Sequence, residues 1–294
     1  MKGIILAAGK ATRLYPTTLV TSKMLLPVYD KPLIYYPLAI LMAADIKDIL
    51  IISSEQDIER MQQLLGDGKS LGIKIHHLVQ PIQRGISDAF ILGEDFIDGD
   101  DCALILGDNI FYGSGLETHL QNAARRTKEF KEATIFGYLV DDPKRFGIVE
   151  LDAKGMPISI EEKPAKPKSN YCVTGLYFYP SGVTNHAKKL VPSPRGELEI
   201  TDLNNIYLKN HQLNVEILDQ SNLWIDAGTY DSLIDANQKV QAIEKKDNIV
   251  ICSPEAIAYQ KGWISLDMLN ETADKMKNSS YGKYLKDLIS HKDS

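Results

Sequence analysis

The sequence predicts an α/β fold, in which a mostly parallel but mixed sheet is flanked by helices. The main observation is that short apolar runs alternate with helical patterns through the first 110 residues, an alternation typical of parallel sheets. A second is that the 294-residue chain, 44% apolar, is long enough to bury one large core. Strands are expected at 3–8, 48–53, 74–79 and 102–106, and helices at 33–44, 55–65 and 86–94.

The second half changes character and predicts a smaller, partly antiparallel region on the same sheet. Strands are expected at 133–140, 146–151, 157–162, 172–179 and 213–218, and helices at 181–190, 198–209 and 230–244. The last fifty residues have a helical pattern rich in Lys, Asp and Asn. No repeat or low-complexity linker separates the halves.

Composition excludes several classes of function. The formal net charge of −6 disfavours nucleic acid as a partner. Cys102, Cys172 and Cys252 are too far apart for a local metal knuckle or redox pair, and a sparse count fits a reducing compartment. The longest mostly apolar stretch, 33–44, is shorter than the roughly 20 residues of a membrane span. We therefore expect a cytoplasmic protein with no membrane partner.

The loop after the first strand has the composition of a phosphate-binding turn. Gly9 and Arg13 follow that strand directly, and Lys23 comes shortly after. Backbone N–H groups and two cations can bind a polyanion there. The loop lacks the glycines of a P-loop or of a dinucleotide fingerprint. From Gly9 and Arg13 alone, an ordinary tight turn with exposed cations is equally consistent.

Two aspartates indicate a metal site beside this loop. Asp108 follows the strand at 102–106, so it belongs on the same sheet edge as Gly9. Asp226 has a similar setting, after Trp224 and before Gly228. Carboxylates of this kind hold Mg²⁺ together with waters and substrate phosphates. The alternatives are an Asx turn for Asp108 and a helix N-cap for Asp226.

Two further cations occur in the second half. Lys163 lies between Glu162 and Pro164, and Arg195 lies between Pro194 and Gly196. Either could bind a second phosphate. A solvated charge run is the more common meaning of each segment in isolation.

Taken together and in order, the motifs resemble those of the sugar-1-phosphate nucleotidylyltransferases. The matching segments cover nearly the whole chain and include LGDNIF, VTGLYFY and RGELEITD. They lie at 9–16, 22–23, 25–27, 31–32, 34–37, 106–111, 161–164, 167–171, 173–179, 195–202 and 224–229.

The resemblance is strongest to members that act on dTTP and glucose 1-phosphate. It implies that dTDP-glucose and pyrophosphate are the products, that Mg²⁺ is the cofactor, and that the protein is a homotetramer. It also implies a Rossmann-like core over 1–244, with a nucleotide-binding half at 1–110 and a sugar-phosphate-binding half at 111–244. The helical segment 245–294 is expected to serve assembly or regulation.

The resemblance also implies roles for individual residues. Arg13, Lys23 and Lys163 would be catalytic, and Asp108 and Asp226 would bind the metal. The nucleotide would be bound by Ala8, Gly9, Gln80, Gly85 and Asp108. The sugar phosphate would be bound by Gly147, Glu162, Lys163, Val173, Tyr177 and Arg195.

The nucleotide side departs from the usual pattern of the family. Ala11 replaces a typical Gly, Met24 a typical Gln and Ala227 a typical Thr, and Arg84, Ser87 and Asp88 change a typical Asp-Gly-Leu-Ala-Gln stretch. These changes leave the choice of nucleotide open. A relative using UTP or CTP, or a non-catalytic sensor of nucleotide sugars on the same fold, is the alternative.

Overall fold

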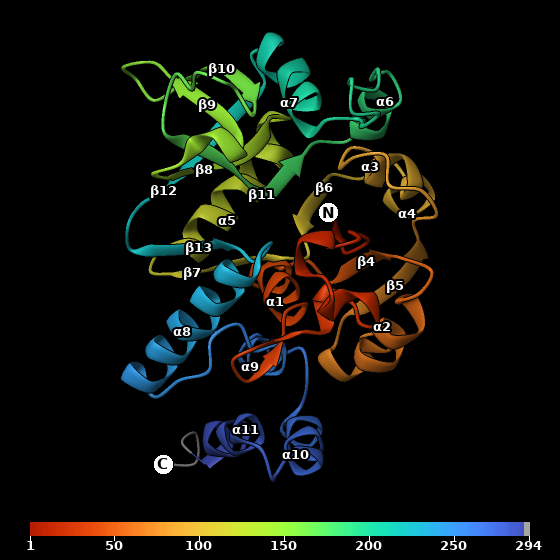
Figure 1. Ribbon diagram of the computed structural model, residues 1–294. Helices are drawn as coiled ribbons and strands as arrows, with labels where there is room; N and C mark the ends of the chain where they lie inside the picture. The colour runs from red at the N-terminus through yellow and green to blue at the C-terminus, as the bar shows by residue number, and fades with distance from the viewer. Residues whose placement is uncertain (291–294) are drawn as a thin grey trace.

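A nine-stranded mixed sheet forms the centre of the molecule in the computed structural model, which describes residues 1–290 (Figure 1). The strands of the first half are β1 (Lys2–Leu6), β4 (Asp48–Ser53), β5 (Lys74–Val79) and β6 (Cys102–Leu106). They are parallel and lie in the order β6-β1-β4-β5. The chain reverses its direction of progress across the sheet at β1, so a crevice is expected where β1 and β6 end.

The second half extends the same sheet with mostly antiparallel pairs. Strand β11 (Tyr171–Tyr179) pairs with β6 and also with β8 (Ala133–Leu139) and β9 (Gly147–Leu151). Strand β10 (Pro157–Glu162) pairs with β9, and β12 (Leu213–Leu218) runs parallel to β8. The prediction of a Rossmann-like α/β fold with a partly antiparallel second region is confirmed.

Helices cover both faces of the sheet (Figure 1). In the first half they are α1 (Tyr35–Ala43), α2 (Ile58–Leu65), α3 (Asp88–Leu92), α4 (Glu94–Ile97) and α5 (Leu116–Arg125). Next come α6 (Val183–Ala187), α7 (Ile200–Lys209) and α8 (Tyr230–Asp247). The N-cap of helix α8 is Thr229, which forms a capping box with Ser232.

Two short antiparallel pairs and one helix were not predicted from the sequence. Strand β7 (Asn109–Gly113) pairs with β13 (Asn222–Asp226), and β2 (Pro27–Val28) pairs with β3 (Lys31–Pro32). Strand β7 follows β6 after only two residues, so from the sequence it could not be told apart from the loop that ends β6. Helix α5 was also missed.

The C-terminal helices belong to the main apolar core. They are α9 (Pro254–Gln260), α10 (Leu266–Lys275) and α11 (Ser280–Ser290), at the end of the molecule away from β9 and β10 (Figure 1). Ala258, Leu269 and Leu285 are buried in the same cluster as Ile5 and Leu38. The role expected of 245–294 stays a prediction, and its last four residues lie outside the described part.

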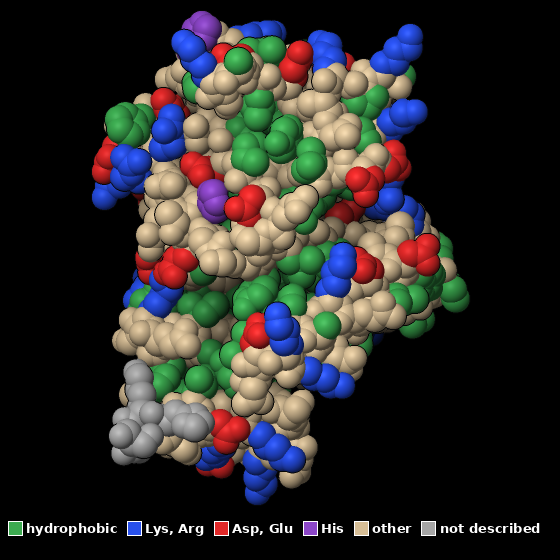
Figure 2. Space-filling view, turned by 90° about the vertical axis from the view of Figure 1, so that its left-hand side faces the viewer, with side chains coloured by type: hydrophobic (Ala, Val, Ile, Leu, Met, Phe, Trp, Pro, Cys, Tyr) green, Lys and Arg blue, Asp and Glu red, His purple; other side chains and the backbone are tan. Residues whose placement is uncertain are grey.

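The surface mixes charges of both signs. On the face drawn in Figure 2, Lys and Arg side chains are interspersed with Asp and Glu, so this face offers no continuous basic track. Within residues 1–290, every helix is too short or too polar to cross a membrane.

Candidate active site

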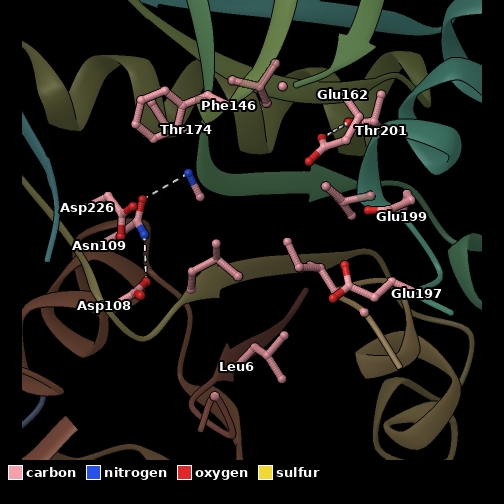
Figure 3. A pocket seen from close by; sticks show the side chains of 18 of the residues that line it. Leu6, Asp108, Asn109, Phe146, Glu162, Thr174, Glu197, Glu199, Thr201 and Asp226 are labelled. Atoms are coloured by element: carbon pink, nitrogen blue, oxygen red, sulfur yellow. Dashed lines mark hydrogen bonds between the residues drawn. The ribbon is translucent and has the colours of Figure 1, made fainter. Parts of the chain in front are cut away.

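A cavity of about 650 Å³ opens where β1 and β6 end, and residues from both halves of the chain line it. In Figure 3, Asp108, Asn109 and Asp226 lie together on one side, and Glu162, Thr201, Glu197 and Glu199 lie on the other. Its volume lies in the range of small-molecule sites. Most residues that the sequence assigned to the two substrates line it: Gly9, Arg13, Gln80, Gly85, Asp108, Gly147, Glu162, Lys163, Val173, Tyr177, Arg195 and Asp226.

Asp108 is held by two donors at the start of the turn after β6. Lys23, on a short 3₁₀ helix (Lys23–Leu25), forms a close ion pair with its Oδ2, and Asn109 donates from Nδ2 to its Oδ1 over 2.9 Å. Burial acts to raise the pKa of Asp108, but the lysine and the hydrogen bonds outweigh it and lower the pKa. Asp108 is therefore ionised at neutral pH.

Asp226 reaches the same place through the β7–β13 pair. In that ladder Asp226 lies opposite Asn109, which brings two segments more than a hundred residues apart to one edge. Burial, and next the negative charge of Asp108, raise the pKa of Asp226 to about 6. The two carboxylates therefore repel each other, and a cation would relieve that repulsion.

This donor set fits Mg²⁺. Within residues 1–290 no group of three or more His, Cys, Asp or Glu side chains could enclose a metal. Mg²⁺ is usually bound by one or two carboxylates and completes its shell with water and phosphate oxygens. Asp108 and Asp226 match that requirement, with the cavity beside them for the other ligands.

Arg13 and Asp226 both lie beside Gly228, close enough for the arginine charge to act on the carboxylate. A Cβ atom at Gly228 would be 2.8 Å from Arg13 Nη2 and 3.0 Å from Asp226 Oδ1. The loop before Arg13 turns at Ala11, which has a left-handed backbone with a φ of 46°. Glycine accepts that conformation more readily, so the departure to Ala costs about 1 kcal/mol.

On the nucleotide side, the turn at 84–87 is hydrogen-bonded to Leu198, just before helix α7 of the sugar side. The backbone carbonyl of Arg84 accepts a hydrogen bond from Leu198 N over 2.6 Å, and Ser87 N donates to Leu198 O over 3.2 Å. Gly85 sits in this contact with a φ of 98°, and a Cβ atom there would be 2.5 Å from Leu198 O. Gln83 donates from its amide to the carbonyl of Ala8, and Ala8 is buried.

The sugar side is rich in carboxylates with fixed orientations. Glu162 accepts from Thr201 Oγ1 over 2.7 Å and from Arg195 Nη2 over 3.4 Å. A Cβ atom at Gly147 would be 3.2 Å from Glu162 Oε2, so glycine keeps this wall close. Burial, and next Glu162, raise the pKa of Tyr177, so its hydroxyl stays protonated. Acceptors and a donor of this kind suit sugar hydroxyl groups.

The two cations of the second half differ in their freedom. Lys163 Nζ is 3.5 Å from Glu162 Oε1 and its side chain is 47% exposed, so it can reach into the cavity. Its φ of 42° is unusual for a residue other than glycine. Arg195 is held by Glu199, whose two carboxylate oxygens each lie 2.9 Å from Nη2.

Three residues named in the sequence analysis lie behind the cavity wall: Lys23 and Ala8, which were expected at the site, and Met24, which differs from the usual family residue. Lys23 is 7% exposed and pairs with Asp108, so it acts on the cavity through that carboxylate in this structure. Ala8 is buried under the loop. Met24 is buried too, and a Cβ atom at Gly107 would be 2.6 Å from its sulfur, so Met24 supports the turn before Asp108.

Sequence reasoning missed several polar residues of the site. Asn109 accepts from Gly175 N over 3.0 Å and from Trp224 Nε1 over 2.7 Å while it donates to Asp108. Its place directly after Asp108 was the only signal. The other missed residues that line the cavity are Gln83, Arg145, Thr174, Glu197, Glu199 and Thr201.

Comparison with known proteins gives the family. The nucleotidyl transferase family model matches residues 2–243. The chain belongs to the nucleotidyl transferase family. It is 50% identical over 289 residues to the glucose-1-phosphate thymidylyltransferase of Neisseria meningitidis serogroup A, covering 98% of this chain and 99% of that one. It is 47% identical to the enzyme of the same name from Mycobacterium tuberculosis H37Rv, with the same coverage.

Solved structures agree with this membership. A Bacillus anthracis protein assigned as a glucose-1-phosphate thymidylyltransferase and crystallised with sucrose is 44% identical, with a TM-score of 0.75 over 81% of this chain and 94% of that chain. A UDP-glucose pyrophosphorylase in complex with UDP-glucose is 22% identical, with a TM-score of 0.71 over 83% of this chain and 98% of that one, and shows the same fold. The family and the enzyme class, nucleotidyl transfer, were both predicted correctly from the motifs.

Proposed function

We propose that this nucleotidyltransferase transfers a thymidylyl group from dTTP to glucose 1-phosphate, giving dTDP-glucose and pyrophosphate. The observation that carries the proposal is the meeting of Arg13, Asp108, Asp226 and Lys163 around one cavity, with Lys23 behind Asp108. The names of relatives at 47% and 50% identity support this choice of substrates.

The reaction is an in-line displacement at the α-phosphorus of the nucleotide. An oxygen of the sugar phosphate forms a bond to that phosphorus, and the bond to the β-phosphate oxygen breaks, so that pyrophosphate leaves with the electron pair. The second pKa of a phosphate monoester is near 6, so the nucleophile is mostly dianionic at neutral pH and needs no general base. The obstacle is repulsion between two polyanions, about 4 kcal/mol for each unit-charge pair at 4 Å and an effective dielectric of 20.

The cations of the site are suited to reduce that repulsion. Arg13 lies beside Asp226 on the nucleotide side and would bind the leaving pyrophosphate. Lys163 lies across the cavity beside Glu162 and would bind the incoming sugar phosphate. Lys23, behind Asp108, would keep that carboxylate ionised and so act on the phosphates through it. Positioning and charge compensation together can supply the catalysis that such a transfer needs.

Asp108 and Asp226 are the residues that would hold Mg²⁺. The ion, when bound, neutralises phosphate charge and helps align the triphosphate. Glu162, Tyr177 and Thr201 bind and orient the sugar, because their donors and acceptors face one end of the cavity. A homotetramer and a cytoplasmic location stay predictions from the sequence.

The test is a panel of nucleoside triphosphates offered with glucose 1-phosphate, with pyrophosphate release as the readout. We expect the highest kcat/KM with dTTP and no turnover after chelation of divalent metal. Asp108→Asn should remove activity, whereas the matched variant Asp95→Asn, at an exposed position on α4, should retain it. Absence of pyrophosphate release with every nucleotide, or full activity of Asp108→Asn, would overturn the proposal.

A further inference from the structure

Three polar side chains form a chain of contacts at the nucleotide end of the cavity. Gln80 Nε2 donates to Asp88 Oδ2 over 3.1 Å, and Arg84 Nη2 donates to Asp88 Oδ1 over 2.7 Å. Gln80 is 6% exposed and Asp88 is 1% exposed, whereas half of the Arg84 side chain is open to solvent. Of the three, Gln80 lines the cavity, together with Gly85 in the turn that follows it.

The carboxylate determines which way the Gln80 amide faces. An ionised Asp side chain only accepts hydrogen bonds, so the atom of Gln80 that faces Asp88 must be the NH₂ group. A flip would place the amide oxygen against a carboxylate oxygen at hydrogen-bond distance, which is repulsive. Among residues 1–290, no protein group donates a hydrogen bond to Gln80 Oε1. The carbonyl of Gln80 is therefore available to a ligand.

The backbone on both sides of this contact is fixed as well. Gln80 N donates to Ser53 O over 2.8 Å at the end of β4, and the 84–87 turn is bonded to Leu198. Asp88 is the first residue of α3, directly after that turn, and is buried. The amide can thus change what it presents only by rotating about its own side-chain bonds, and that is the rotation that Asp88 opposes.

We propose that Asp88 is a positioning residue that makes this site select nucleobases with a ring N–H on the pairing edge. This inference rests on the proposed function and on the family resemblance, which implies that Gln80 and Gly85 face the nucleobase. Thymine and uracil carry N3–H and can donate to the fixed carbonyl. Cytosine has an unprotonated N3, so this acceptor would face the carbonyl oxygen of Gln80, which is also an acceptor. A binding site discriminates strongly against a ligand that leaves buried polar groups without hydrogen-bond partners.

Arg84 gives the proposal a directional test. A guanidinium only donates, so in Asp88→Asn it binds the oxygen of the new amide, and the NH₂ group of that amide then faces Gln80. Gln80 must then turn its carbonyl toward this NH₂ group and its own NH₂ toward the base. The preferred pyrimidine should change accordingly, whereas a purely structural role for Asp88 would lower activity with both nucleotides equally.

The experiment compares kcat/KM for dTTP and dCTP at saturating glucose 1-phosphate. The wild-type protein should favour dTTP by roughly a hundred-fold. In Asp88→Asn the ratio of dTTP to dCTP should fall by roughly ten- to hundred-fold, with dCTP turnover rising in absolute terms. Arg84→Ala keeps the carboxylate and should keep the dTTP preference. The double variant should accept both pyrimidines, because the amide that replaces the Asp88 carboxylate can then present either atom.

Each result bears on the proposal. An unchanged ratio in a folded Asp88→Asn protein overturns it, and so does a lost preference in Arg84→Ala. A wild-type protein that uses dTTP and dCTP equally well overturns it while leaving nucleotidyl transfer to glucose 1-phosphate intact. Failure of the proposed function is recognised separately, by the absence of pyrophosphate release with every nucleotide. If Asp88→Asn does not fold, the wild-type and Arg84→Ala ratios still decide.

Discussion

At the scale of single residues, the site places positively charged side chains beside carboxylates, around the cavity that would hold two negatively charged substrates. Arg13 and Asp226 both fit beside Gly228 because it has no side chain, and Asp108 keeps its charge because of Lys23. Two carboxylates and two phosphate substrates would repel without these cations. Loss of Arg13 or Lys163, which are both accessible from the cavity, should therefore affect the reaction far more than the fold.

Removing Arg13 tests the nucleotide side. Arg13→Ala should lower kcat/KM roughly a hundred-fold, a loss of about 3 kcal/mol, because the charge on the leaving pyrophosphate is no longer balanced. Arg125→Ala is the matched control, since Arg125 is on α5, half exposed and outside the cavity. Steady-state rates of pyrophosphate release measure both, and comparable rates for the two variants would exclude the role given to Arg13.

Removing the charge of Lys163 tests the sugar side. Lys163→Met keeps the aliphatic stem, and it should raise KM for glucose 1-phosphate several-fold while KM for dTTP changes little. Lys168→Met provides the comparison, because Lys168 lies nearby, pairs with Glu161 over 2.6 Å and does not line the cavity. A larger effect on dTTP would exchange the assignments of Lys163 and Arg13.

At the scale of elements, the limits of sequence reasoning are visible in how the two aspartates meet. Asp108 could be placed beside Gly9 from the sequence, because parallel strands end at one edge. The approach of Asp226 depends on the β7–β13 pair, whose strands are short and far apart in the chain. Asn109 was missed for the same reason, since its contacts to Gly175 and Trp224 exist only after that pairing.

The turn around Gly85 is the element that joins the two substrate sides. Gly85→Ala should destabilise the protein by several kcal/mol and raise KM for both substrates, because the new Cβ would meet Leu198 O at 2.5 Å and force the turn away. Gly182→Ala is closely matched in φ, 94° against 98°, and the new Cβ there would have no atom within 4 Å. Thermal unfolding of the two variants separates the steric contact from backbone strain, and equal losses would show that the contact to Leu198 is unimportant.

At the scale of the whole molecule, the C-terminal helices close the core over buried polar groups. Lys31 on β3 is 3% exposed and pairs with Glu244 of α8 over 2.9 Å. Glu255 of α9 accepts a close hydrogen bond from the Tyr281 hydroxyl on α11, and Ser253 lies 2.8 Å from the same hydroxyl. The helical pattern of the last fifty residues predicted the helices, but it contained no sign that they share a core with β1.

The buried carboxyl of Glu255 should make stability depend on pH. Burial raises the pKa of Glu255 above its usual value of 4.5, although the Tyr281 hydrogen bond and Lys31 act to lower it. Between the unfolded and folded pKa values the folded protein holds more protons, so the free energy of unfolding falls as pH rises through that window. The loss is about 1.4 kcal/mol for each unit of separation between the two pKa values.

Replacing this carboxyl with an amide removes the ionisation while keeping the acceptor, because the side chain in Glu255→Gln can still accept from Tyr281. The melting temperature of this variant should therefore fall less than that of the wild type as pH rises above the usual glutamate pKa of 4.5. A difference of about 1 kcal/mol corresponds to a few degrees in that measurement. Glu117→Gln, at an exposed position on α5, is the control and should follow the wild-type curve. Parallel melting curves for Glu255→Gln and the wild type would mean that the C-terminal helices accommodate Glu255 without an ionisation cost.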